Sequence, residues 1–186
     1  MAFGRFLGSG EPIASGTAKP GSDPGDTETV RRIAVQLEAL PIERARFLAA
    51  FAYILTRAAN ADLDISDAES RAIEQLVAEH GKLPEAQAVL VAQIARHQEL
   101  LYGGTEDYLV TRQFKELSTD EDRVALLRCC YIVGAADDTI TSDESAVLQE
   151  IAEELDVDRP AVNAIRDEFA PKLAAIQAML KLRSTP

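Results

Sequence analysis

A nine-residue motif that occurs twice constrains the fold of this chain more than any other feature. Residues 61–69 read Ala-Asp-Leu-Asp-Ile-Ser-Asp-Ala-Glu, and residues 136–144, which lie 75 positions later, read Ala-Asp-Asp-Thr-Ile-Thr-Ser-Asp-Glu. Alanine, aspartate, isoleucine, a hydroxyl residue and glutamate coincide in register. Apolar positions on both sides correspond as well, for example Phe51 with Leu126 and Ile73 with Leu148. This self-similarity predicts two equivalent helix pairs, one in each half of the chain.

Apolar residues recur at spacings of three and four through most of the chain, and no stretch alternates convincingly with a period of two. The pattern predicts helices over about 42–60, 68–80, 84–100, 105–117, 118–136 and 142–155, and a last one from 158 onward. A shorter stripe predicts an earlier helix that ends at Pro41. Its members are Val30, Ile33, Ala34 and Leu37.

Glycine and proline set the predicted breaks. Gly103 and Gly104 are expected to end the helix that starts near residue 84, and Pro171 to kink the last helix, because proline removes a backbone donor. The predicted fold is therefore all-α, a single compact bundle of seven or eight helices with an internal pseudo-two-fold repeat. Residues 1–25, rich in glycine and proline, are expected to form a flexible segment, and residues 26–186 the helical domain.

The charge balance limits the classes of partner. Nineteen Lys and Arg stand against 31 Asp and Glu, a formal net charge of −12, which disfavours nucleic acid. Cations, or a basic surface on another protein, are better expected partners. Cys129 and Cys130 are adjacent in a predicted helix and are not expected to bridge, which fits a cytoplasmic protein.

No run of 18 apolar residues predicts a membrane span. The first residues include Phe3, Phe6 and Leu7, which are either an anchor to a partner or to the inner membrane face, or a frayed terminus.

Both motifs contain a helix-capping signature. Ser66 and Glu69 form Ser-x-x-Glu, and Thr141 and Glu144 form Thr-x-x-Glu, so each hydroxyl is expected to accept from a backbone N–H while each glutamate reaches back. Capping explains these residues without a ligand, at roughly 0.5 to 2 kcal/mol for each cap.

The aspartates of the motifs are less easily explained by capping. They follow the C-terminal end of a helix, where the helix dipole disfavours negative charge, and a bound cation would reverse that penalty. The match to an EF-hand is poor, because the sixth position is Asp67 instead of glycine and the twelfth is Ile73 instead of glutamate. Turn-and-cap chemistry and cation binding both remain open. The candidate metal ligands are Asp62, Asp64, Glu69, Asp137, Asp138 and Glu144.

The motif between two amphipathic helices resembles the TerB-like family, which includes tellurite-resistance proteins. The resemblance rests on Ala61, Asp62, Ile65, Ser66 and Glu69 and on their counterparts in the second motif, and it covers roughly residues 42–168. It implies a helical bundle with internal pseudo-symmetry and an acidic divalent-cation site. Where the family often has glycine after the first aspartate, this chain has Leu63 and Asp138.

No phosphate-binding glycine loop, nucleophile elbow or zinc-protease helix is found, so no catalytic residue or cofactor is expected. The first hypothesis is a non-enzymatic stress-response protein, linked to tellurite or other metal stress, that binds calcium, magnesium or manganese. The alternative is an acidic scaffold without a metal that docks a basic protein or a membrane-associated complex.

Overall fold

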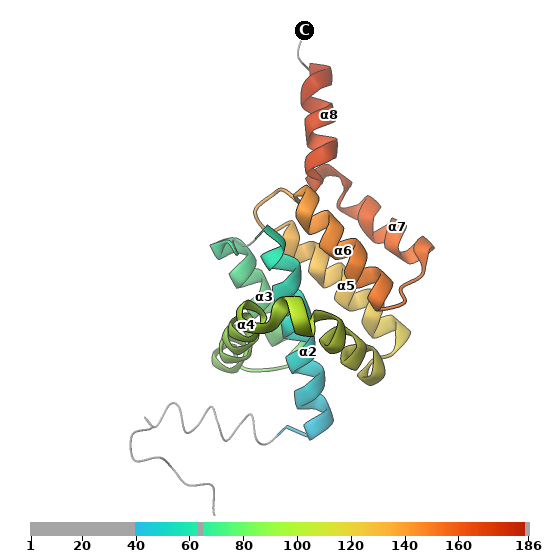
Figure 1. The fold of residues 1–186 in the computed structure, drawn as a ribbon. Coiled ribbons are helices and arrows are strands. Elements are labelled where there is room, and N and C mark those ends of the chain that lie inside the picture. The colour runs from blue at the N-terminus through green and yellow to red at the C-terminus, as the bar shows by residue number, and fades with distance from the viewer. Residues whose placement is uncertain (1–39, 63–64, 185–186) are drawn as a thin grey trace, which may run out of the picture.

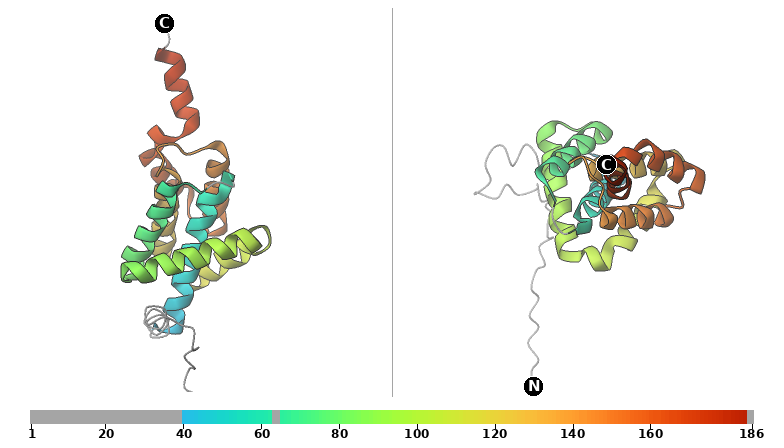
Figure 2. Two further views of the ribbon diagram at one scale, coloured as in Figure 1. Left: turned by 90° about the vertical axis from the view of Figure 1, so that its left-hand side faces the viewer. Right: turned by 90° about the horizontal axis from the view of Figure 1, so that it is seen from above.

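Helix α2 (Ile42–Ala59) lies at the centre of the structure, a computed structural model that describes residues 40–62 and 65–184. Every residue from Ala50 to Ala59 is buried, because the helix is covered on all sides by others. Its central position is visible in both views of Figure 2, and the all-α prediction is confirmed: seven α-helices and two 3-10 turns make up the described residues. The predicted boundary near residue 26 and the helix predicted over 30–37 lie outside them.

Two helix pairs follow from the repeat. α2 leads through a 3-10 turn, η1 (Asn60–Asp62), to α3 (Asp67–Gly81), and α5 (Asp120–Gly134) leads to α6 (Ser142–Glu154). The helices α2 and α5 pack against each other, and each also packs against the second helix of the other pair. The contacts therefore have the symmetry that the sequence repeat predicts (Figure 1).

The predicted break at Gly103 and Gly104 is wrong, because α4 (Glu85–Leu117) continues through both. Each glycine costs a helix interior roughly 1 kcal/mol relative to alanine, and the packing of α4 along α2 and α3 offsets that cost. The helix changes direction as it passes around α2 (Figure 2).

Pro171 lies in a break between two helices, whereas the sequence predicts a kink within one helix. α7 (Arg159–Glu168) stops before it, Pro171 lies in the 3-10 turn η2 (Ala170–Lys172), and α8 (Ala174–Ser184) starts anew. In Figure 1, α8 extends away from the body at the end opposite the start of α2. None of the described helices combines the length and the apolar character that crossing a membrane requires.

Candidate functional site

Both motifs form the predicted capping boxes. The Ser66 hydroxyl accepts from the Glu69 N–H at 3.2 Å, and the Ser66 N–H donates to Glu69 Oε2 at 2.7 Å. The Thr141 hydroxyl accepts from the Glu144 N–H at 3.2 Å, and the Thr141 N–H donates to Glu144 Oε2 at 2.7 Å. These equal distances show that the two motifs share one local structure as well as one sequence pattern.

The two capping glutamates meet where the halves of the molecule join. Both side chains are buried, with 4% of each residue exposed. The Glu144 carboxyl lies within hydrogen-bonding reach of Glu69, and burial, together with the charge of Glu69, raises the pKa of Glu144 to about 7. Two carboxylates this close cannot both ionise without cost, so the pair holds a proton that isolated glutamates would have lost. We call Glu69 and Glu144 the glutamate pair.

The surroundings of the glutamate pair are small and apolar. A β-carbon on Gly134 would lie 3.4 Å from Glu144 Oε1, so the Gly134 backbone packs close to this carboxyl. Ala59, its counterpart in the first half, is fully buried. Ile65 and Ile140, which precede the two caps, are buried as well.

A third capping box provides an internal comparison. It lies at the start of α5, where the Thr119 N–H donates to Asp122 Oδ2 at 3.0 Å. The Asp122 N–H in turn donates to the Thr119 hydroxyl at 3.2 Å. This box is exposed and belongs to neither repeat, so the same capping chemistry occurs here without burial of the carboxyl.

The aspartates of the second motif make other contacts. Asp137 is exposed and accepts a hydrogen bond from the Thr139 N–H at 3.1 Å. Asp138 is also exposed and pairs with Lys172, which lowers the pKa of its carboxyl. Its φ of 78° lies in the left-handed region that glycine favours, at the position where the family often has glycine. Asp138 is therefore used for the turn and for an ion pair.

The turn of the second motif is tied to the C-terminal segment. The Ile140 N–H donates to the Lys172 carbonyl at 2.8 Å, and the Ala174 N–H donates to the Ile140 carbonyl at 2.9 Å. The Gln177 amide donates to the Asp138 carbonyl at 3.0 Å. The start of α8 thus covers the second acidic turn.

In the first motif, the structure describes the side chain of only one of the three candidate ligands, Glu69. Asp62 ends η1 and its side chain is not described, and Asp64 lies outside the described residues. Within residues 40–62 and 65–184, no three His, Cys, Asp or Glu side chains gather closely enough to hold a metal ion. Of the six candidate ligands, the structure brings together Glu69 and Glu144.

A second buried polar cluster was not predicted. Arg57, with 6% of its side chain exposed, pairs with Glu154 at 2.7 Å and with Glu150 at 2.8 Å, both on α6. It also lies 3.4 Å from Asp107 on α4, whose pKa is raised by burial and lowered in part by Arg57. The cluster joins three helices and is a structural feature. The sequence contained a signal for this cluster, because Arg57 is the one charged residue in the stretch Ala50–Ala59, which is otherwise almost entirely apolar and is buried.

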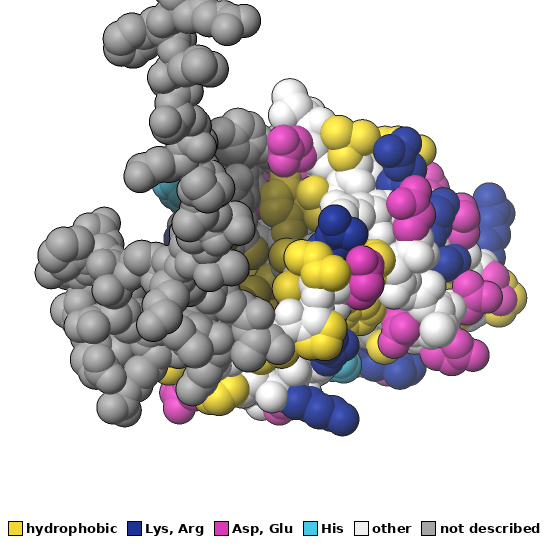
Figure 3. Space-filling model, turned by 90° about the horizontal axis from the view of Figure 1, so that it is seen from below, with side chains coloured by type: hydrophobic (Ala, Val, Ile, Leu, Met, Phe, Trp, Pro, Cys, Tyr) yellow, Lys and Arg dark blue, Asp and Glu magenta, His cyan; other side chains and the backbone are white. Residues whose placement is uncertain are grey.

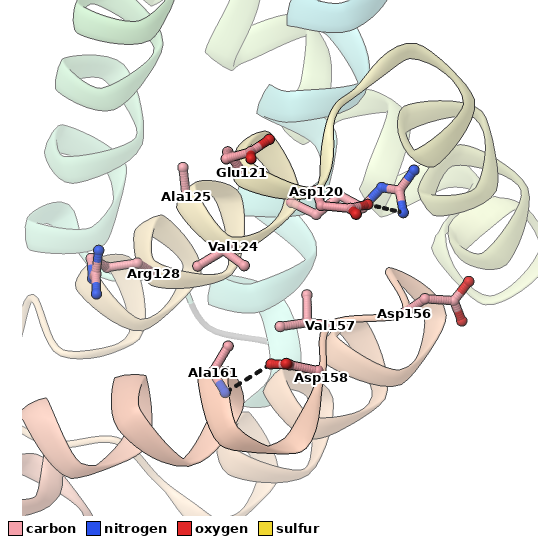
Figure 4. Close-up of a pocket in the computed structure, with 10 residues that line it drawn as sticks. Asp120, Glu121, Val124, Ala125, Arg128, Asp156, Val157, Asp158 and Ala161 are labelled. Carbon is pink, nitrogen blue, oxygen red and sulfur yellow. Dashed lines mark hydrogen bonds and ion pairs between the residues drawn. The ribbon is translucent and has the colours of Figure 1, made fainter.

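The cavity shown in Figure 4, between the start of α5 and the start of α7, also carries acidic residues. Each of three has another role there: Asp120 pairs with Arg123 at 3.0 Å, Asp156 pairs with Lys115 at 2.8 Å, and Asp158 caps α7 through the Ala161 N–H. Their side chains do not converge on one point in Figure 4, so this cavity is a weaker candidate than the glutamate pair.

Cys129 and Cys130 are both free and buried, which confirms that adjacent cysteines in a helix do not bridge. His80 Nε2 lies 3.4 Å from the Cys129 sulfur.

A sequence model of the family described as Tellurite resistance protein TerB matches residues 47–167. This span starts inside α2 and ends inside α7, so it contains both motifs and the glutamate pair. The comparison with curated proteins returned no match, and the comparison with solved structures returned none either.

Proposed function

Because the chain belongs to the TerB family, we propose that it is a non-enzymatic protein that senses or buffers divalent cations through the glutamate pair. The observation that supports this proposal is the burial of two equivalent carboxyls side by side, Glu69 and Glu144, where the two repeats join.

Capping alone does not require two acids at this place. Glutamine fills the last position of a capping box as well as glutamate does, and a glutamine would avoid the repulsion between buried carboxylates. A cation between the two carboxylates would remove that repulsion and would connect the two halves of the molecule.

The residues partly fit a hard cation. Each glutamate uses Oε2 for its cap, so Oε1 of Glu69 and Oε1 of Glu144 are the oxygens that would face an ion. Calcium takes six to eight oxygens and magnesium keeps several waters, so two carboxylates are the start of a site. In our proposal Asp62 and Asp64 add ligands from the first turn. Asp137 and Asp138 would add theirs only after leaving their present hydrogen-bond partners.

Binding of a cation is expected to release protons. Because the pKa of Glu144 is about 7, this carboxyl is about half protonated at neutral pH, and a cation must displace the proton that remains. The occupied form would then be favoured as pH rises. This coupling would let the protein respond to metal or tellurite stress at cytoplasmic pH, which is the role that the family's description supports.

The test is a titration of the full chain with calcium, magnesium and manganese, followed by amide NMR and by proton release at pH 7. We expect shifts or broadening confined to residues around both motifs. The variant Glu69→Gln/Glu144→Gln should lose them, whereas Asp122→Asn, which alters an equivalent but exposed cap, should keep them. A response that survives in the double glutamine variant, or none in the natural chain, contradicts the proposal.

A scaffold role is the second candidate, and the projection of α8 favours it. Met179, Leu180 and Leu182 are more than half exposed on this helix, and a partner protein at the cytoplasmic face of the inner membrane would cover them. Capture of that partner in a chelator, and its loss in Met179→Asp/Leu182→Asp, would support this role. Capture that requires a cation would favour the first proposal.

A further inference from the structure

A groove of about 320 Å³ lies between α2 and α4, away from the glutamate pair. Val91, Ile94 and Val110 form its α4 side, on both sides of the two glycines at which a break was predicted. On its α2 side lie Arg46, Ala49, Ala50 and Tyr53.

The α2 side of the groove has the residue spacing expected for contact with a helix. Ile42, Arg46, Ala49 and Tyr53 follow one another at spacings of four, three and four residues, which is the stripe that one helix presents to another. Ile42 is 63% exposed and Ile94 50% exposed, although both are large and apolar. Seen from the end at which α2 begins, hydrophobic side chains gather in a hollow of the described surface (Figure 3). Ala50 and Tyr53 are 5% exposed, so the open apolar surface here is formed by Ile42 and Ile94, and large apolar side chains left open beside a groove indicate an interaction surface.

We propose that the occupant of this groove is the segment Val30–Leu37 of the same chain. The segment lies outside the described residues, and it carries the apolar stripe from which the sequence predicts a helix. Pro41 at the start of α2 has φ −52° and ψ 137°, an extended backbone. Proline also disfavours helical backbone at Leu40, so the chain turns at this point.

The register of such a hairpin follows from the turn. Helices joined by two to five residues lie antiparallel, and a turn between residues 41 and 42 makes facing residue numbers add to about 83. The four apolar residues of the segment then face the four α2 residues of the groove. Leu37 faces Arg46, Ala34 faces Ala49, Ile33 faces Ala50, and Val30 faces Tyr53.

The lengths agree as well. Val30–Leu37 and Arg46–Tyr53 each span eight residues, which is about 12 Å of helix at 1.5 Å per residue. A segment attached next to the groove also binds at a high effective concentration, which favours it over a second copy of the chain. Phe3, Phe6 and Leu7 have no such fixed register, because more than 30 residues separate them from α2.

The test is a disulfide in the full-length chain between Ala34→Cys and Ala49→Cys. The native thiols should not compete, because both are buried and burial raises the pKa of Cys129 to about 11. In oxidised glutathione we expect a bond within one molecule, seen by mass spectrometry, at least tenfold faster than in the control. The control is Ala34→Cys with Lys82→Cys, an exposed position next to the start of α2, where Arg44 contacts the His80 carbonyl.

Further outcomes distinguish between possible occupants of the groove. Equal rates in the test and control pairs, or a bond that joins two molecules at micromolar concentration, overturn the proposal; the second result would assign the groove to another copy. Ile33→Asp/Leu37→Asp should slow the disulfide to the control rate and raise the fluorescence of an apolar dye, while the helical signal of the body is kept. A slower disulfide in Phe3→Asp/Phe6→Asp would instead place the first residues of the chain in the groove.

Discussion

Replacement of Glu144 by glutamine tests the central physical claim about the glutamate pair. The change keeps the cap, because the amide oxygen can accept from the Thr141 N–H as the carboxylate does. The new amide group can also donate to Glu69, so the buried contact is satisfied without a shared proton. Only the capacity for a second negative charge is removed.

The expected magnitude follows from the pKa. That of Glu144 is about 7 in the folded chain, against an ordinary value of 4.5. Between these two pH values the unfolded chain has lost the proton that the folded chain keeps, so the free energy of unfolding falls as pH rises through the window. The loss amounts to roughly 3 kcal/mol and is complete above pH 7. Glu144→Gln should therefore be more stable than the natural chain at pH 8, and close to it at pH 4.5.

Urea unfolding followed by circular dichroism at pH 4.5, 6, 7 and 8, in chelator, measures this difference. For a chain of 186 residues, roughly 3 kcal/mol corresponds to about 6–12 °C in the melting temperature at pH 8. Asp122→Asn changes an exposed cap and serves as the control, because a gain in stability at pH 8 is expected only where the replaced carboxyl is buried. If Glu144→Gln lowers stability at pH 8, or if its difference from the natural chain does not change between pH 4.5 and 8, the reasoning about the pair is wrong.

Three substitutions test the packing. Gly104→Ala should raise the free energy of unfolding by about 0.5–1 kcal/mol, because a β-carbon there meets nothing within 4 Å; a melt that is unchanged or lower would show that α4 needs this glycine. Gly81→Ala should lower it by about 1 kcal/mol or more, because its β-carbon would lie 2.9 Å from Leu83 Cγ, and a more stable variant would mean that Leu83 moves aside at little cost. Arg57→Met should cost about 3 kcal/mol by leaving partly buried acids such as Glu154 without a counter-ion, with partial recovery in Arg57→Lys; a cost below 1 kcal/mol in urea would contradict the role given to this cluster.

Local structure was readable from the sequence, since its causes are local. The hydroxyl and glutamate of each motif specify a cap within three residues, and both caps formed as predicted. The repeat also predicted which helices are equivalent. The break predicted at Gly103 and Gly104 is wrong because helix propensity alone does not include the tertiary contacts of α4, which the sequence does not display.

The meeting of Glu69 and Glu144 could not be predicted in this way. The repeat shows that the two residues are equivalent, but equivalent residues can lie at opposite ends of a pseudo-symmetric molecule. Their contact depends on how α2 and α5 pack against each other, which brings the start of α6 against η1. The Arg57 cluster has the same origin, because its acids come from α4 and α6 and have no fixed spacing from the arginine in sequence.

The three capping boxes separate what a cap needs from what this site has in addition. All three satisfy the same two backbone groups at nearly the same distances, and the box at Thr119 does so with an exposed carboxylate. Burial and pairing are therefore properties of the join between the repeats and not of capping. Two acids at that join reduce stability at neutral pH by an amount that a proton restores and that a cation would restore under the proposed function. The functional hypothesis thus concerns Glu69 and Glu144 first, and the aspartates of the turns contribute only to the extent that they can reach an ion held by that pair.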